Sequence, residues 1–172
     1  MTAMIRILGI DPGLRRTGWG VIGVEGSRLV HIAHGVIAPA PSLPLADRLG
    51  VLFADITEMI GLHRVEAAAV EETFVNANPR SALLLGQARG AVLAALSQAH
   101  LPVAEFAPRQ IKLAVVGTGS ADKTQIAFMV RRLLPTVGDF AKTGGADAAD
   151  ALACAMCGAH NKPAALAVRI KA

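Results

Sequence analysis

The chain has 172 residues, 53% of them hydrophobic, which suits a single domain with a substantial core. No stretch offers the roughly 20 mostly apolar residues of a membrane-spanning helix, and the start lacks the apolar segment of a signal peptide. We therefore expect a cytoplasmic protein with no membrane attachment. Lys and Arg number 17 against 13 Asp and Glu, and this surplus favours an anionic partner.

Three short apolar segments at the beginning of the chain predict β-strands. Residues 5–10 form an apolar run that ends at the turn sequence Asp11-Pro12-Gly13. Residues 17–24 and 29–38 lie on either side of a second turn, Glu25-Gly26-Ser27. Because connections this short cannot make a parallel crossover, we expect the three strands to form an antiparallel meander.

The rest of the chain alternates helical and strand patterns. Apolar residues recur at helical spacing from Leu45 to Ile60. The remaining expected elements are strands at 67–71 and 103–106 and helices at 79–100, 108–116, 121–134 and from about 146 onward. A meander followed by this alternation predicts an α/β fold with a mixed five-stranded sheet flanked by helices. We expect one domain over residues 1–160 and a flexible tail over residues 161–172.

Four carboxylates fall at the ends of predicted elements. Asp11 closes the first strand, Glu71 closes the fourth, and Asp147 and Asp150 are spaced to share one face of the last helix. Ligands bind beyond the carboxyl ends of parallel strands, so the four acids meet if the first and fourth strands are neighbours. Taken singly, Asp11 also suits a turn cap and Asp147 a helix N-terminus, and spacing alone does not choose between Glu71 and Glu72.

Four like charges in one place repel each other unless cations neutralise them. Mg²⁺ prefers carboxylate oxygens together with water and substrate phosphate. Two such ions about 3.5–4 Å apart can activate water against a phosphodiester and stabilise the leaving oxygen. The constellation therefore predicts a two-metal nuclease centre.

These residues belong to a series of motifs that resembles the RuvC family of bacterial crossover (Holliday) junction endodeoxyribonucleases in order and spacing. The motifs extend over nearly the whole chain, and their combination is far more specific than any one of them. They are GIDPG at 9–13, TGWG at 17–20, VEE at 70–72, LGQARG at 85–90, RQIK at 109–112, VVGTGSADK at 115–123 and ADAADALA at 146–153.

The resemblance implies a ribonuclease H-like fold and a homodimer that resolves four-way DNA junctions by paired symmetric nicks, in recombination and repair. It implies Mg²⁺ as cofactor, with Mn²⁺ as a substitute and two ions per subunit when substrate is bound. It assigns metal binding and catalysis to Asp11, Glu71, Asp147 and Asp150, and so selects Glu71 over Glu72. It also implies a branch-migration motor complex as partner.

Several other residues are candidate DNA contacts. The resemblance places Lys112 and Lys123 near the scissile phosphate, although a solvated helix lysine is the plainer interpretation of each. Arg80 and Arg109 are candidates for backbone contacts, which set affinity rather than sequence choice. Phe74 is either a buried anchor or a wedge inserted at an unstacked junction base; the resemblance favours the wedge.

The helix expected at 79–100 is the candidate dimer interface. Gly86 and Gly90 are four residues apart and would allow another helix to approach closely, although small residues also suit packing on the chain's own sheet. Cys154 and Cys157 lie within an apolar helical stretch, and we expect them to be buried, reduced and structural.

Two other functions remain open from the sequence. One is a ribonuclease H-like nuclease that acts on RNA or DNA flaps, and the other is a junction-binding scaffold without catalysis. ATP hydrolysis is disfavoured, because the P-loop-like segment at 117–124 carries Asp122 where the motif requires glycine.

Overall fold

The structure is a computed structural model that describes residues 4–72 and 78–161. Its elements follow the predicted order, and the bounds are β1 Ile5–Asp11, β2 Thr17–Glu25, β3 Arg28–Ile37, α1 Leu45–His63, β4 Ala67–Glu71, α2 Pro79–Gln98, β5 Val103–Phe106, α3 Pro108–Val116, α4 Lys123–Leu133, α5 Phe140–Thr143 and α6 Gly145–Asn161. The short helix α5, which Asp139 caps through the backbone N–H of Ala141, was not predicted. Residues 162–172, most of the expected tail, lie outside the described part.

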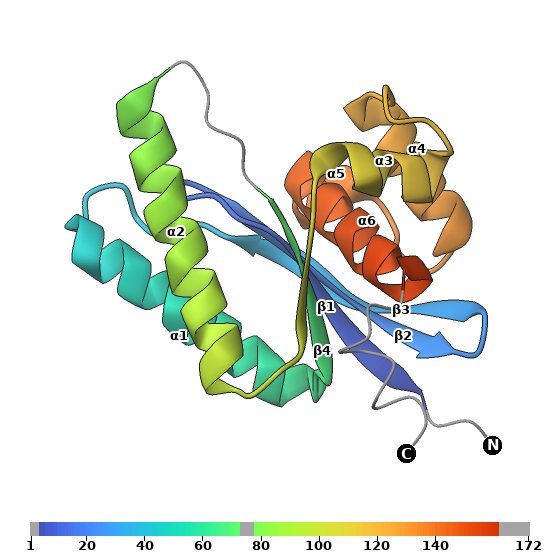
Figure 1. Cartoon of the computed structure of the whole chain (residues 1–172), viewed down its shortest axis with the longest axis horizontal. Helices are drawn as coiled ribbons and strands as arrows, with labels where there is room; N and C mark the ends of the chain where they lie inside the picture. The colour runs from blue at the N-terminus through green and yellow to red at the C-terminus, as the bar shows by residue number, and fades with distance from the viewer. Residues whose placement is uncertain (1–3, 73–77, 162–172) are drawn as a thin grey trace.

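The five strands form one mixed sheet in the order β3-β2-β1-β4-β5 (Figure 1). β1, β2 and β3 pair antiparallel, whereas β4 pairs parallel with both β1 and β5. The fold prediction is therefore confirmed, and the pairing of β1 with β4 meets the condition under which the acids at their ends come together. Within the described residues, no helix is long and apolar enough to cross a membrane.

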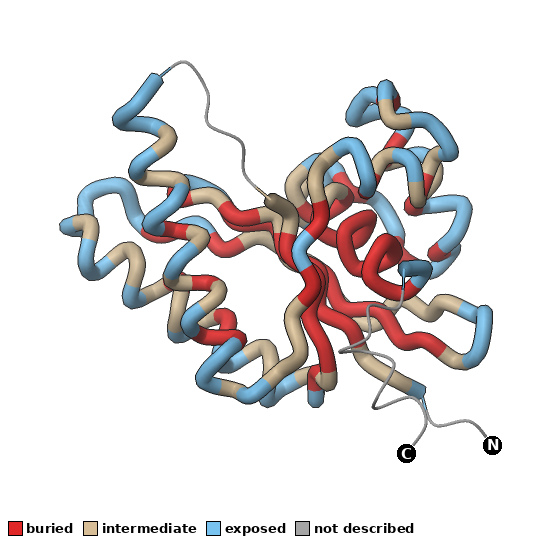
Figure 2. The backbone as a smooth tube through the Cα atoms, in the orientation of Figure 1, coloured by how far each residue is buried: buried red, intermediate tan, exposed pale blue. Residues whose placement is uncertain are grey.

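Helices cover both faces of the sheet. α1 and α2 pack on one face, and α6 lies on the other face with α3, α4 and α5 around it (Figure 1). β1 serves both layers, because Ile7 belongs to the core beneath α6 while Leu8 and Ile10 belong to the core beneath α1 and α2. Figure 2 shows the resulting buried band along the central strands and α6.

Glycines on β1 and β2 allow α6 to lie directly against the sheet. A Cβ atom at Gly9 would collide with the backbone carbonyl of Ala151, and one at Gly18 would collide with the backbone carbonyl of Asp147. Side chains at these positions would push the helix outward. The glycines therefore determine how closely the acidic first turns of α6 approach the end of β1.

The same helical layer confirms the predicted burial of the two cysteines and shows the structure of the P-loop-like segment. Cys154 and Cys157 are buried in α6 and unpaired, and burial raises the pKa of the Cys154 thiol well above its ordinary value. The P-loop-like segment is the end of one helix and the start of the next. Gly117 ends α3 with φ of 85°, and the Asp122 carboxylate accepts a hydrogen bond from the Gln125 N–H at the start of α4.

Candidate active site

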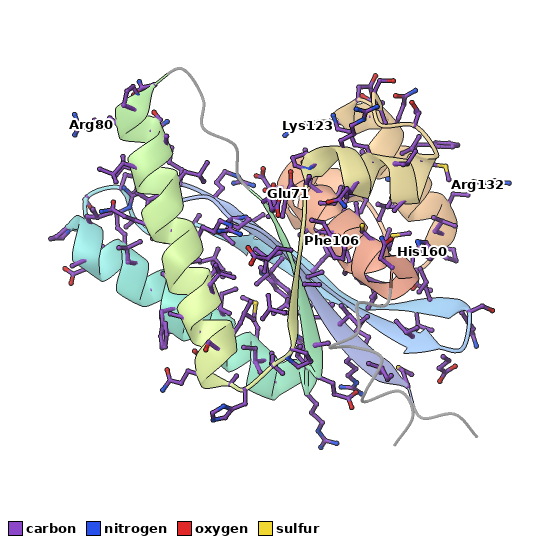
Figure 3. The ribbon with its side chains drawn as sticks, viewed as in Figure 1. Glu71, Arg80, Phe106, Lys123, Arg132 and His160 are labelled. Carbon is purple, nitrogen blue, oxygen red and sulfur yellow. The ribbon has the colours of Figure 1, made fainter. Side chains whose placement is uncertain are left out.

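Asp11 and Glu71 are brought together by the pairing of β1 with β4. The parallel register aligns Ile10 with Val70, so the next residue on each strand is one of the two acids. Both carboxylates line a cavity of about 270 Å³, and Glu72 does not. The full lining is Asp11, Glu71, Pro108, Ile111, Lys112, Lys123, Ile126, Asp150 and Ala153. Figure 3 shows Glu71 at the end of β4, with Lys123 on the same side of the sheet.

The two acids of α6 differ in position. Asp150 lines the cavity, and its Oδ2 lies 3.4 Å from Lys123 Nζ. Asp147 is not part of the lining; its Oδ2 accepts a hydrogen bond from Arg16 Nε at 2.6 Å. Of the four predicted acids, three therefore gather around one cavity while the fourth is held by an arginine. In this arrangement no three His, Cys, Asp or Glu side chains of the described residues are grouped as metal ligands.

The pKa values of two carboxyl groups in this cavity, Asp11 and Glu71, are strongly raised. Burial, followed by the charges of Asp150 and Asp147, raises the pKa of Asp11 from 3.8 to about 7. Burial, followed by the charges of Asp11 and Asp150, raises the pKa of Glu71 from 4.5 to about 8. Such shifts show that negative charge here is insufficiently compensated by the protein itself. A cation placed between the carboxylates would favour their ionised forms.

Lys112 and Lys123 supply the positive charge of the cavity. Lys112 extends from α3 and Lys123 is the first residue of α4. Burial raises the pKa of Asp150 as well as that of Glu71, and the charges of both lysines oppose the rise at each acid. The Asp150 carboxylate in turn raises the pKa of Lys123. Both lysines therefore lie at the cavity beside acids, and their predicted place near the scissile phosphate stays a prediction.

Arg80 and Arg109, two further candidate DNA contacts, do not line this cavity. Arg109 packs across the loop before α4, where a Cβ at Gly119 would touch its side chain. Arg80 is exposed near the start of α2, and Figure 3 shows it well separated from Glu71. Phe74 lies outside the described residues, so its predicted role as wedge or anchor stays a prediction.

Arg16 is the neighbour of the site that the sequence did not reveal. Its Nε donates to Asp147, and its Nη2 donates to the Gly144 carbonyl at 3.2 Å. The segment between β1 and β2 suggested only a turn, and Arg16 is 131 positions from Asp147. No local spacing pattern connects residues so far apart. The pairing becomes visible only once α6 is placed on the sheet.

The sheet order and the acids at the ends of β1 and β4 define a ribonuclease H-like α/β protein with a carboxylate-rich nuclease-type site. The family model described as crossover junction endodeoxyribonuclease RuvC matches residues 7–158. The chain belongs to this family of crossover junction endodeoxyribonucleases.

Individual relatives agree over nearly the full length. A crossover junction endodeoxyribonuclease RuvC of Hyphomonas neptunium is 64% identical over 163 residues, which are 95% of each chain. A solved structure of Thermus thermophilus RuvC gives a TM-score of 0.80 at 35% identity, covering 92% of this chain and 95% of that one. The T. thermophilus protein in complex with Holliday junction substrate gives a TM-score of 0.84 at 34% identity, covering 94% and 97%.

Proposed function

We propose that this chain resolves four-way DNA junctions by metal-dependent hydrolysis of phosphodiester bonds. The observation that carries the proposal is the cavity in which Asp11, Glu71 and Asp150 face Lys112 and Lys123. Acids that bind hard cations and lysines that attract phosphate together suit metal-dependent cutting of a DNA backbone. A scaffold without catalysis gains nothing from carboxylates that repel one another.

The donor set fits Mg²⁺ or Mn²⁺. Carboxylate oxygens are hard ligands, and burial together with the charges of neighbouring carboxylates raises the pKa values of Asp11 and Glu71. We assign the ligand role to Asp11, Glu71, Asp147 and Asp150, with two ions per subunit when DNA is bound. When bound, such ions supply activation of water and neutralisation of charge at the phosphate.

The chain's own residues hold and shape the reacting group. Lys112 and Lys123 are placed to stabilise the negative charge that grows on the phosphate during cleavage. The apolar part of the wall consists of Pro108, Ile111, Ile126 and Ala153, and apolar walls strengthen the electrostatic interactions inside. Asp147 joins the other acids once its carboxylate leaves Arg16.

A symmetric homodimer through α2 fits paired nicking, because a two-fold junction presents two equivalent strands. Ala88, Val92, Ala95 and Leu96 are the buried residues of α2. Gly86 and Gly90 are exposed, and a Cβ at either would meet nothing within 4 Å. The glycines are therefore not among the residues with which α2 packs on its own chain. This supports a role in the interface over the alternative that they serve packing on the chain's own sheet. Arg89 pairs with Glu105 of the same chain.

Cleavage assays on matched substrates test the proposal. A mobile four-way junction, a linear duplex of the same sequence and an RNA–DNA hybrid are incubated with Mg²⁺ or with chelator. We expect nicking of the junction alone, and only with metal. Cleavage of the hybrid or of a flap in preference to the junction would support the rival nuclease, and junction binding without cleavage would support the scaffold.

The branch-migration motor partner and the cytoplasmic location stay predictions.

A further inference from the structure

A second cavity adjoins the connection between β1 and β2, residues 12–16, on the side that faces α1 and α2. We call this connection the Asp11 loop. The cavity has a volume of about 440 Å³, between the β1–β2 connection, the first turn of α1 and the N-terminal half of α2. Gly13, the nearest lining residue in sequence, is two positions beyond Asp11. The cavity is lined by Gly13, Leu14, Arg15, Arg16, Arg48, Ser81, Leu84 and Leu85.

The lining contains three guanidinium groups and no carboxylate. Arg15 is exposed and has no ion pair to any residue in the described ranges. Arg16 is the only one of the three with a carboxylate partner within those ranges, and that partner, Asp147, belongs to the α6 side. The cavity therefore carries positive charge that the surrounding protein does not balance.

Arg48 is held in place but incompletely satisfied. Its Nη2 donates to the Leu14 carbonyl at 3.0 Å, which fixes the guanidinium against the loop. Its Nε is buried and has no hydrogen-bond partner within the described residues. A buried donor without an acceptor costs free energy, and such groups in native proteins call for a specific explanation. An anion entering the cavity would bring acceptor oxygens to this guanidinium group.

The apolar part of the lining narrows the class of anion. Leu84 and Leu85 of α2 are half-buried and stand beside the guanidinium groups and the Ser81 hydroxyl. A sugar–phosphate backbone offers the same combination, because the phosphate pairs with arginine while the deoxyribose packs against apolar side chains. A small inorganic anion would make no use of the leucines.

We propose that this cavity binds a backbone phosphate of the DNA strand that enters the active site, with Arg15 and Arg48 as its principal partners. The inference rests on the proposed function for the identity of the ligand. It adds a contact point on the α1–α2 side of the sheet, opposite Lys112 and Lys123. The strand would then be held on both sides of the Asp11 loop.

The test is the salt dependence of DNA binding, measured with chelator so that no strand is cut. Each phosphate contact contributes about 0.9 to the slope of log Kd against log salt concentration. We expect Arg15→Ala to lower this slope by about that amount and to weaken binding several-fold at low salt. The double variant Arg15→Ala/Arg48→Ala should lose more. Thermal unfolding checks its fold, and Arg48→Lys replaces Arg48→Ala if the double variant does not fold.

The matched control is Arg132→Ala, which removes the same charge. Arg132 is exposed near the end of α4, and Figure 3 shows it at the far edge of the molecule from Glu71. We expect it to leave the slope unchanged. Equal slopes for Arg15→Ala and Arg132→Ala would overturn the proposal.

Two further arms separate the alternatives. The same titrations on linear duplex report the phosphate contact even if junction cleavage fails, so a failure of the proposed function is distinguishable from a failure of this site. Inorganic phosphate, compared with chloride at equal ionic strength, tests a free-anion site. If phosphate raises the Tm of wild type but not of Arg15→Ala, and the DNA slope is unchanged, the DNA contact is wrong.

Discussion

The two faces of the sheet use glycine in opposite ways. Beneath α6, Gly9 and Gly18 are in contact with helix backbone, and any side chain there would collide with it. On the other face, Gly86 and Gly90 of α2 point to open space. The first face is completed within one chain and brings acids to the end of β1, whereas the second exposes small residues at which a partner can approach. The same residue type thus marks internal packing on one face and a candidate interface on the other.

The largest effect should come from removing the acids on the α6 side. Asp11→Asn, Glu71→Gln or Asp150→Asn each removes one carboxylate from the cavity. We expect junction nicking in Mg²⁺ to fall by about 10³-fold or more, a loss at least as large as that of one oxyanion donor. Junction binding should stay equal or become tighter, because repulsion of phosphate decreases.

Glu72→Gln is the matched control for these variants. Glu72 follows Glu71 directly but does not line the cavity, so nicking should change little. Nicking at a nearly wild-type rate by one of the three variants would remove that acid from the ligand set. A severe loss in Glu72→Gln would show that the neighbouring glutamate had been chosen wrongly.

The close contact between α6 and the sheet predicts that a side chain at Gly18 destabilises the fold. Gly18→Ala adds a Cβ that meets the backbone of Asp147, which cannot move as a side-chain end could. We expect the free energy of unfolding to fall by about 1–3 kcal/mol. Gly50→Ala in α1, where a Cβ meets nothing within 4 Å, should raise it by about 0.5–1 kcal/mol. Urea unfolding measures both, and similar values for the two variants would contradict this contrast.

On the α2 face the expected change concerns assembly rather than folding. Gly86→Leu places a bulky side chain where the partner helix is expected, and we predict at least about a tenfold weaker dimer, or about 1.4 kcal/mol. Analytical ultracentrifugation measures the association, and circular dichroism verifies the fold. Gly50→Leu, on an equally open helix position, is the control and should leave the dimer intact. A wild-type chain that is monomeric at micromolar concentration would rule out this interface.

A further expected effect is a pH dependence of stability in the absence of metal. The pKa values of Asp11 and Glu71 are raised to about 7 and about 8 in the folded protein, so folding favours their protonated forms. Their contribution is fully present below the ordinary carboxyl pKa and is lost as pH rises through about 7 and 8. With chelator present, Tm should fall between pH 5 and pH 8.5, and it should fall less for Glu71→Gln. An equal fall in both proteins would contradict the assigned origin.

Most of the fold was accessible from the sequence because its signals are local. Short apolar runs, turn sequences and the helical spacing after Leu45 predicted the elements, whereas the pairing of the first and fourth strands was only a condition for the acids to meet. Glu71 needed the family resemblance, because it and Glu72 occupy equivalent places in the sequence pattern. The helix α5 is only four residues long, too short to produce a periodic pattern.

Long-range pairing was the part that could not be predicted. The contact of Arg16 with Asp147 depends on how closely α6 lies on β2, which the glycines set. The cavity around Arg48 likewise joins three segments that are distant in sequence. No periodicity in any one segment indicates such a meeting point, so these features appear only in three dimensions.

The most direct test of the account is cleavage of a supercoiled plasmid that extrudes a cruciform. Two active sites in a symmetric dimer should cut opposite strands of the four-way junction within one binding event. We predict that Mg²⁺ converts the plasmid to linear product with nicks at symmetric positions and ligatable ends, and that chelator abolishes the reaction. Accumulation of nicked circles without linear product, or equal cleavage of a plasmid lacking the cruciform, would contradict paired resolution by this protein.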